Sequence, residues 1–335
     1  MRLIPNKILS GAALAAVVMV ASPSIWAAGT GNLFVSSEDD DIVTVFDGKT
    51  LEPIKKIKTE ERPRWLAFSP DHTKVYVACG DGDAIDVIDV KQMKVVDRIP
   101  DIDDPEIFAI GPNDKRLYIS NEDDAQFTIY DLASKNVVSK VDVGQEPEGV
   151  LVAPDGKTAY VTSEVANIVH KINLDSNEIE ANIVVGNRPR RFALTGDGKH
   201  LWVTNELSGS VSIIDTQTNK VADTIKFEPK GFRAEDVTPV GITLSEDGSR
   251  AFVTLGRANH VAFVNADTHE VEDYVLVGAR AWGVALSNDG TQLYVTNGLS
   301  DDMSIVDIAN KKQLRSIPAG RRPHSVVVDT PAGSS

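Results

Sequence analysis

The chain has 335 residues, with 34 basic and 49 acidic side chains and a net charge of −15 at pH 7. So acidic a protein is not expected to bind nucleic acid or an anionic membrane, because both require clustered Lys and Arg side chains to displace counterions. The single cysteine, Cys79, excludes an internal disulfide, and no Cys-x-x-Cys-His sequence is present for covalent haem attachment.

Residues 1–28 have the pattern of a secretory signal peptide. Arg2 and Lys7 precede the apolar run ILSGAALAAVVMVA, and the small residues of SIWAA follow. We therefore predict cleavage near Ala27 or Ala28 and a periplasmic mature protein. A retained membrane anchor is the alternative, but the apolar run is short for a bilayer. No later segment of the sequence is apolar enough to predict a membrane span.

A repeat fills the remaining residues, 29–335, and predicts a single domain. An aromatic residue recurs at the second position of a predicted strand: Phe34, Tyr76, Tyr118, Tyr160, Trp202, Phe252 and Tyr294. Neighbours are 42 residues apart, except for 50 between Trp202 and Phe252. A proline precedes the next innermost strand at Pro63, Pro105, Pro147, Pro189, Pro239 and Pro323, and Ala281 takes its place in one repeat. Seven copies of a four-strand unit predict an all-β fold, a seven-bladed β-propeller.

The order of strands follows from propeller geometry. The apolar segment after each proline is expected to be innermost, the aromatic strand comes second, and the most polar strand lies at the exposed edge. The chain begins on a second strand at Leu33 and ends on an innermost strand at residues 324–328. We therefore predict that strands from both termini share one blade and close the ring. The eight additional residues of the fifth repeat fall within 226–238.

Several repeat sequences carry a family resemblance. LYVTN at 293–297, LYISN at 117 and LWVTN at 201 resemble the YVTN-repeat family of seven-bladed propellers, and the resemblance covers residues 32–328. The order of the loop variants and the opening GNLFVSSED resemble the exported propeller encoded alongside pyrroloquinoline-quinone (PQQ)-dependent alcohol catabolism. That subfamily brings no established activity with it. The resemblance implies a pathway context: a partner protein from a PQQ or cytochrome oxidation system.

Two sets of loop residues are predicted to meet at one mouth of the propeller axis. The first set follows the prolines and forms a ring: Arg64, Glu106, Glu148, Arg190, Val240, Trp282 and His324. The second set follows the aromatic strands: Glu38, Glu122, Glu164 and Glu206. Three interpretations remain open. The arginines and glutamates form solvated ion pairs across blade boundaries; or Arg64 and Arg190 grip a carbonyl or anionic ligand against Trp282; or the four glutamates of the second set hold a divalent cation.

Motifs of catalysis are scarce. The sequence has no Gly-x-Ser-x-Gly elbow and no P-loop, and its six histidines are not spaced as zinc ligands. His324 alone maps to the ring, as a candidate base. Seven repeats, no adjacent cysteine pair and few tryptophans argue against bound PQQ.

These observations favour a monomeric, non-enzymatic binding or scaffold propeller without a cofactor, which would hold a small molecule or a periplasmic partner protein at the axial mouth. The alternative is a lactonase-like hydrolase that uses the mouth glutamates and a divalent metal.

Overall fold

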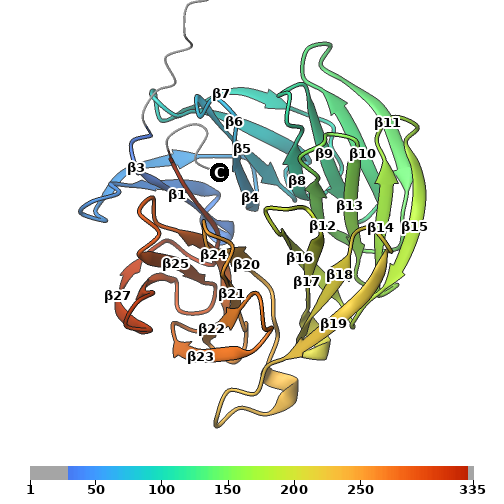
Figure 1. The fold of residues 1–335 in the computed structure, drawn as a ribbon. Helices are drawn as coiled ribbons and strands as arrows, with labels where there is room; N and C mark the ends of the chain where they lie inside the picture. The colour runs from blue at the N-terminus through green and yellow to red at the C-terminus, as the bar shows by residue number, and fades with distance from the viewer. Residues whose placement is uncertain (1–28, 331–335) are drawn as a thin grey trace, which may run out of the picture.

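The computed structural model describes residues 29–330, so the predicted signal peptide lies outside the described residues. Those residues form seven four-stranded antiparallel sheets arranged around one axis (Figure 1). The predicted seven-bladed propeller is confirmed. No helix within the described part of the chain is long and apolar enough to cross a membrane.

Every blade has the same order of strands from the axis outward. The innermost strands are β4 (Pro63–Phe68), β8 (Pro105–Ile110), β12 (Pro147–Val152), β16 (Pro189–Leu194), β20 (Ile242–Leu244), β24 (Ala281–Leu286) and β28 (Pro323–Val328). The second strands are β1 (Leu33–Ser37), β5 (Lys74–Cys79), β9 (Arg116–Asn121), β13 (Thr158–Ser163), β17 (His200–Asn205), β21 (Arg250–Thr254) and β25 (Gln292–Asn297). The second strands are almost fully buried, which explains their near-continuous apolar sequence.

The two outer positions of each blade are progressively more polar. The third strands are β2 (Ile42–Phe46), β6 (Ala84–Asp89), β10 (Gln126–Asp131), β14 (Ile168–Asn173), β18 (Ser210–Asp215), β22 (His260–Asn265) and β26 (Asp302–Asp307). The outermost strands are β3 (Pro53–Lys58), β7 (Lys94–Ile99), β11 (Asn136–Asp142), β15 (Glu178–Val184), β19 (Lys220–Lys226), β23 (Val271–Leu276) and β27 (Lys312–Pro318). Three single-turn 3-10 helices complete the described chain: η1 (Glu38–Asp40), η2 (Glu206–Ser208) and η3 (Ala234–Asp236).

Both ends of the chain contribute to one blade. Strand β28 pairs antiparallel with β1, and Leu33 lies opposite Val328. The colours of Figure 1 therefore run once around the ring before the N-terminal and C-terminal strands meet. The predicted closure is confirmed, and pairing on both sides of β1 removes its free edge.

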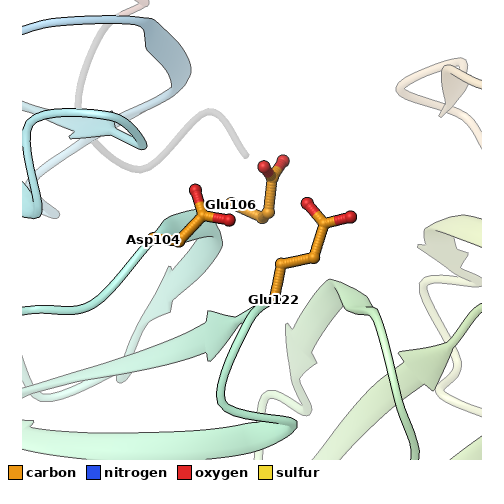
Figure 2. A group of neighbouring side chains, drawn as sticks. All are labelled: Asp104, Glu106 and Glu122. Carbon is orange, nitrogen blue, oxygen red and sulfur yellow. The ribbon is translucent and has the colours of Figure 1, made fainter.

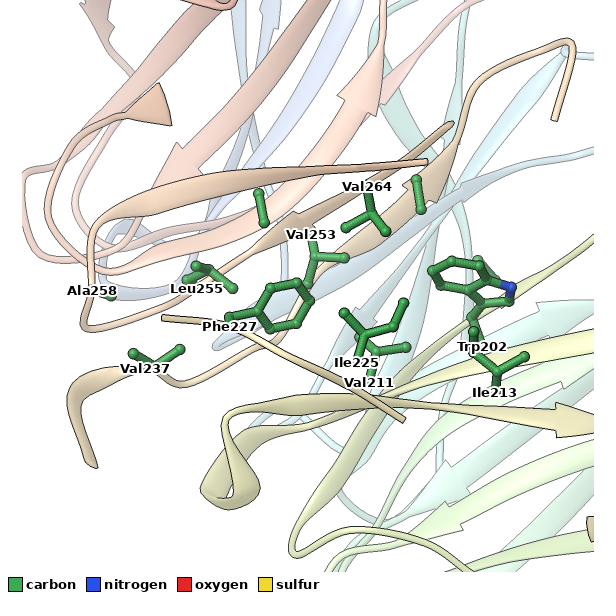
Figure 3. Packing of buried hydrophobic residues seen from close by; sticks show 13 residues of the cluster. Trp202, Val211, Ile213, Ile225, Phe227, Val237, Val253, Leu255, Ala258 and Val264 are labelled. Carbon is green, nitrogen blue, oxygen red and sulfur yellow. The ribbon is translucent and has the colours of Figure 1, made fainter. Parts of the chain in front are cut away.

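The additional residues of the fifth repeat extend the core between two blades. Phe227 and Val237 lie at the two ends of the insertion and belong to the same buried cluster as Trp202 and Val253 (Figure 3). Because both anchors are buried, the connection covers apolar surface. It also delays the start of β20 to Ile242, three residues after Pro239.

Hydroxyl groups fasten neighbouring blades to each other. In each case a Ser or Thr of a second strand donates a hydrogen bond to the backbone carbonyl of the ring residue in the next blade. The pairs are Ser36 with Arg64, Ser120 with Glu148, Thr162 with Arg190, Thr204 with Val240, Thr254 with Trp282 and Thr296 with His324, at 2.6–3.3 Å. At the seventh boundary Ala78 occupies the hydroxyl position, next to the blade of Glu106. These hydrogen bonds fix the backbone of the ring residues relative to the adjacent blade.

Candidate functional site at the axial mouth

A β-bulge places each ring residue at the axis. In six blades the register between the innermost and second strands shifts immediately after the first strand residue; in one, Pro63 pairs with Cys79 but Leu66 pairs with Val77. Two residues therefore face one residue of the partner strand, which re-aims their side chains. In the remaining blade the assigned strand β20 begins only at Ile242, but Val240 donates a backbone hydrogen bond to Thr254 and Gly241 accepts one from it, so two residues again face one.

In six of the seven blades, the residue before the proline position has left-handed backbone geometry. Six such residues have φ between 31° and 62°: Arg62, Asp104, Glu146, Arg188, Arg280 and Arg322. None is glycine, although this region is unfavourable for residues with a Cβ atom. The conformation places a second layer of charged side chains beside the ring. Four members of this layer were not predicted from the sequence: Asp104, Glu146, Arg280 and Arg322. Their common position before the proline in the repeat was the available signal.

Glu106 is the centre of one buried ionic cluster. Its carboxylate, which is fully buried, lies 2.5 Å from Arg64 Nη1 and 2.6 Å from Arg62 Nη2. Arg64 Nε also lies 3.2 Å from Glu38. These contacts join three consecutive blades. Ion pairs across blade boundaries were one of the sequence-based interpretations, but the structure buries the pairs instead of leaving them solvated.

A second cluster is organised around Arg190. Its guanidinium contacts Glu164 through Nη1 and lies 3.3 Å from Glu148 through Nη2. Arg191 Nη2 approaches the same Glu148 oxygen, at 3.1 Å. Arg188 Nε lies 2.6 Å from the other oxygen of Glu164. Both carboxylates of this blade are therefore held by guanidiniums of the next blade.

The carboxyl groups of the mouth differ strongly in acidity. Although burial acts to raise it, the charges of Arg190, Arg191 and Arg64 lower the pKa of Glu148 to about 2. Burial raises the pKa of Glu164 to about 7, because Arg190 offsets it only in part and the charge of Glu148 adds to it. Burial and the adjacent carboxylate of Glu106 raise the pKa of Glu122 to about 9. At neutral pH the mouth thus holds a protonated acid beside a carboxyl that titrates.

Glu122 and Glu164 are close enough to act on one bound molecule. Carboxylate oxygens of Glu122, Glu146 and Glu164 lie within 4.8 Å of one another. Glu122 also belongs to a similar group with Asp104 and Glu106, and Figure 2 shows these three carboxyl groups gathered at the mouth. Two members of the first group, Glu146 and Glu164, line a surface hollow of about 420 Å³, together with Asn167, Arg188 and Leu207 among others.

The predicted cation site has a different geometry from the one expected. Among residues 29–330, no convergent acidic group contains Glu38 or Glu206, so the four glutamates of the second set do not form one site. In the group that does contain Glu164, both of its oxygens already contact guanidiniums. Glu106, in the other group, contacts two arginines. Hard cations require several free, convergent oxygens, so neither group fits a divalent metal.

His324 and Trp282 occupy the remaining part of the ring. Their rings lie 4.9 Å apart, and the guanidinium of Arg280 lies over the indole. His324 is almost fully buried, and burial together with the charges of Arg64, Arg191 and Arg190 lowers its pKa well below the usual range. His324 is therefore a poor general base. All six predicted ligand-binding residues (Arg64, Glu106, Glu148, Arg190, Trp282 and His324) do lie around the axis, in two ionic clusters and one aromatic pair.

Comparisons with known proteins identify relatives of the fold. The family model described as "Lactonase, 7-bladed beta-propeller" matches residues 173–324. No curated protein sequence is significantly similar to the chain. A periplasmic gluconolactonase of Pseudomonas aeruginosa is 18% identical with a TM-score of 0.76, and the match covers 90% of this chain and 99% of that one. A putative 6-phosphogluconolactonase of Bacteroides fragilis is 17% identical with a TM-score of 0.75, covering 92% and 99%.

Solved structures whose names describe other activities share this fold. Hydrazine synthase of Kuenenia stuttgartiensis is 19% identical with a TM-score of 0.75, and the match covers 88% of this chain and 99% of that one. The family model and the solved structures named as lactonases nevertheless favour the hydrolase alternative. The prediction of a non-enzymatic binding or scaffold propeller is therefore wrong by these comparisons.

Proposed function

We propose that the protein is a hydrolase of lactones that acts at the axial mouth. The observation that carries this proposal is the pair of carboxyl groups of Glu122 and Glu164, with pKa values of about 9 and about 7 and oxygens within 4.8 Å of each other. A general acid and a general base with separated pKa values near the working pH are what ester hydrolysis requires. The lactonase family model and the named neighbours support the same reaction class.

The residues of the mouth can be assigned to the steps of this reaction. The Arg188 guanidinium, which contacts one Glu164 oxygen, would turn to the lactone carbonyl and free that oxygen. The Glu164 carboxylate then takes a proton from water, whose oxygen adds to the lactone carbonyl. The guanidinium of Arg188, which is partly exposed beside the hollow, would stabilise the developing oxyanion. Collapse of the intermediate breaks the ring C–O bond, and Glu122 gives its proton to the departing alkoxide. The product is the open-chain hydroxy acid.

A pH–rate profile and three variants test these roles. Wild-type kcat/KM on δ- and γ-lactones should rise with an apparent pKa of about 7 and fall with one of about 9, because Glu164 must be ionised and Glu122 protonated. Glu164→Gln and Glu122→Gln should each reduce the rate by roughly 10²- to 10⁴-fold. Glu180→Gln, at an exposed position of the same blade, is the control. Wild-type protein that hydrolyses no lactone faster than the buffer does would refute the proposal.

We also propose that the enzyme is exported and that an oxidation reaction supplies its substrate. The pattern of residues 1–28 and the resemblance to YVTN-repeat propellers associated with PQQ-dependent oxidation support an exported enzyme. Oxidation of a cyclic hemiacetal yields a lactone, so a dehydrogenase of that kind would supply the substrate. An N-terminus near Ala28 or Gly29 in periplasmic protein, measured by mass spectrometry, would support export; a retained Met1 would contradict it. The donor sets at the mouth favour metal-independent hydrolysis, which activity after chelation with EDTA would support.

A further inference from the structure

A small cavity on the propeller axis is not used by the proposed reaction. Residues from all seven blades line it, and its volume is about 90 Å³. A cavity needs only roughly 10–15 Å³ on this scale to hold one water molecule, so it has room for a larger occupant. Much of the lining is apolar, with Trp65, Ile107 and Phe192 among the wall residues. Three side chains of the wall carry buried polar nitrogen atoms: Arg191, Trp282 and His324.

The hydrogen-bond partners of His324 determine its tautomer. Its Nε2 atom lies 3.4 Å from Arg64 Nη2 and 3.3 Å from Arg191 Nη2. A guanidinium can only donate hydrogen bonds, so Nε2 must be the acceptor. The neutral ring therefore carries its hydrogen on Nδ1, and that buried atom has no hydrogen-bond partner among the described residues.

The other two polar side chains of the wall also have an unused donor. Trp282 Nε1 and Arg191 Nη1 are buried, and within residues 29–330 neither has a hydrogen-bond partner. Three N–H groups without an acceptor thus come from three side chains that line one cavity. Unsatisfied buried polar groups are uncommon in folded proteins, and several together indicate a missing partner. The missing partner must be an acceptor, because all three groups are donors.

The balance of charge also favours an anion at this place. Arg191 lies 3.1 Å from one oxygen of Glu148, and Arg190 lies 3.3 Å from the same oxygen. Two guanidiniums therefore share one carboxylate oxygen. The guanidinium of Arg191 otherwise lies over the face of Trp65, 5.0 Å from the ring centre. Arg191 is therefore a buried cation with less than one compensating negative charge. An anion in the cavity would supply negative charge, whereas a neutral occupant such as water would not.

We propose that the axial cavity binds one small monovalent anion, a halide or a carboxylate of the size of formate or acetate. The anion accepts hydrogen bonds from Arg191, Trp282 and His324, and Trp65 forms an apolar wall beside it. The site is separate from the carboxyl groups assigned to lactone hydrolysis, so it stands or falls independently of that activity.

Thermal unfolding in a series of sodium salts tests the site. At constant ionic strength, maintained with a bulky organic buffer anion, chloride, formate and acetate should each raise the melting temperature of the full protein along a saturating curve. Trp282→Phe keeps an aromatic ring at this position and removes the N–H donor together with the pyrrole part of the indole, so it should weaken the apparent affinity by at least roughly 10-fold, as expected for loss of one hydrogen bond to a charged group. Arg191→Met should abolish the saturating rise, while Arg315→Met, an exposed control, should leave it unchanged.

Competition between formate and chloride would show whether carboxylates and halides occupy the same place. In crystals soaked in bromide, one anomalous peak should lie between Arg191 and His324. If the wild-type protein shows no saturating rise, or if Trp282→Phe shows the same curve as the wild type, the cavity holds water only and the inference is wrong. The Trp282→Phe result decides the question even if Arg191→Met does not fold.

Discussion

Removing the charge of Glu106 should destabilise the propeller far more than a surface ion pair would. In Glu106→Gln the side chain keeps its shape, but Arg62 and Arg64 lose the carboxylate that lies 2.6 and 2.5 Å away. Breaking a buried pair costs about 3–5 kcal/mol, because a desolvated charge is left without its partner. Arg64 retains Glu38 at 3.2 Å, so we expect a loss near the lower limit, about 3 kcal/mol.

This loss can be measured as a shift of the unfolding transition. For a domain of this size, about 3 kcal/mol corresponds to a decrease in melting temperature of roughly 5 °C. Urea denaturation followed by tryptophan fluorescence gives the free energy of unfolding independently. Glu235→Gln is a matched control, because Glu235 pairs with Arg233 at an exposed site and its substitution should leave both quantities unchanged. A Glu106→Gln protein as stable as the control would show that the buried cluster does not contribute in the way argued.

Three further predictions concern acidity and assembly. Burial and the charge of Glu106 raise the pKa of Glu122 to about 9, above the unfolded value of 4.5. The contribution of Glu122 to stability is therefore complete below pH 4.5 and is lost as the pH rises to about 9. Glu122→Gln does not titrate, so it should gain stability relative to wild type over that interval in pH-dependent melts. Ala78→Ser should supply the missing hydrogen bond to the Glu106 carbonyl and stabilise the protein by about 1 kcal/mol in urea denaturation; no gain in stability would contradict this role of the hydroxyl groups. Deleting residues 321–335 removes β28 and should cause aggregation or loss of the cooperative transition, and a truncated protein that melts like the full-length one would contradict the closure by β28.

The repeat made the fold predictable from the sequence. An aromatic residue and a proline at a fixed interval identify the strand order, and the terminal strands at Leu33 and His324 reveal the closure. The same alignment of repeats identified the ring residues, because equivalent positions in a propeller face the same axis. Even the position of the insertion was evident from the longer interval before Phe252.

The depth and pairing of the site residues were not predictable in the same way. From the sequence alone, a charged residue in a loop is expected to be exposed to solvent. Only the three-dimensional packing shows that Arg64 and Glu106 are buried against each other. The bulge also allows the residue after the ring position to reach the axis, so Arg191 lines the axial cavity alongside its neighbours. The pKa of each carboxyl group also depends on its burial and its neighbours in the folded protein. Glu148 and Glu164 belong to one blade, yet their pKa values are about 2 and about 7.

The shared blade also imposes an order in time on folding. Strand β1 is among the first parts of the described chain to be synthesised, but its pairing partner β28 is the last strand. Leu33 and Val328 are separated by about 300 residues, which ribosomes need roughly 15–60 s to make at typical rates. During that interval β1 can pair only with β2, and its inner edge is open to other chains. The ring therefore cannot close until synthesis is almost complete, and the slowest contact to form is the one that joins the two ends.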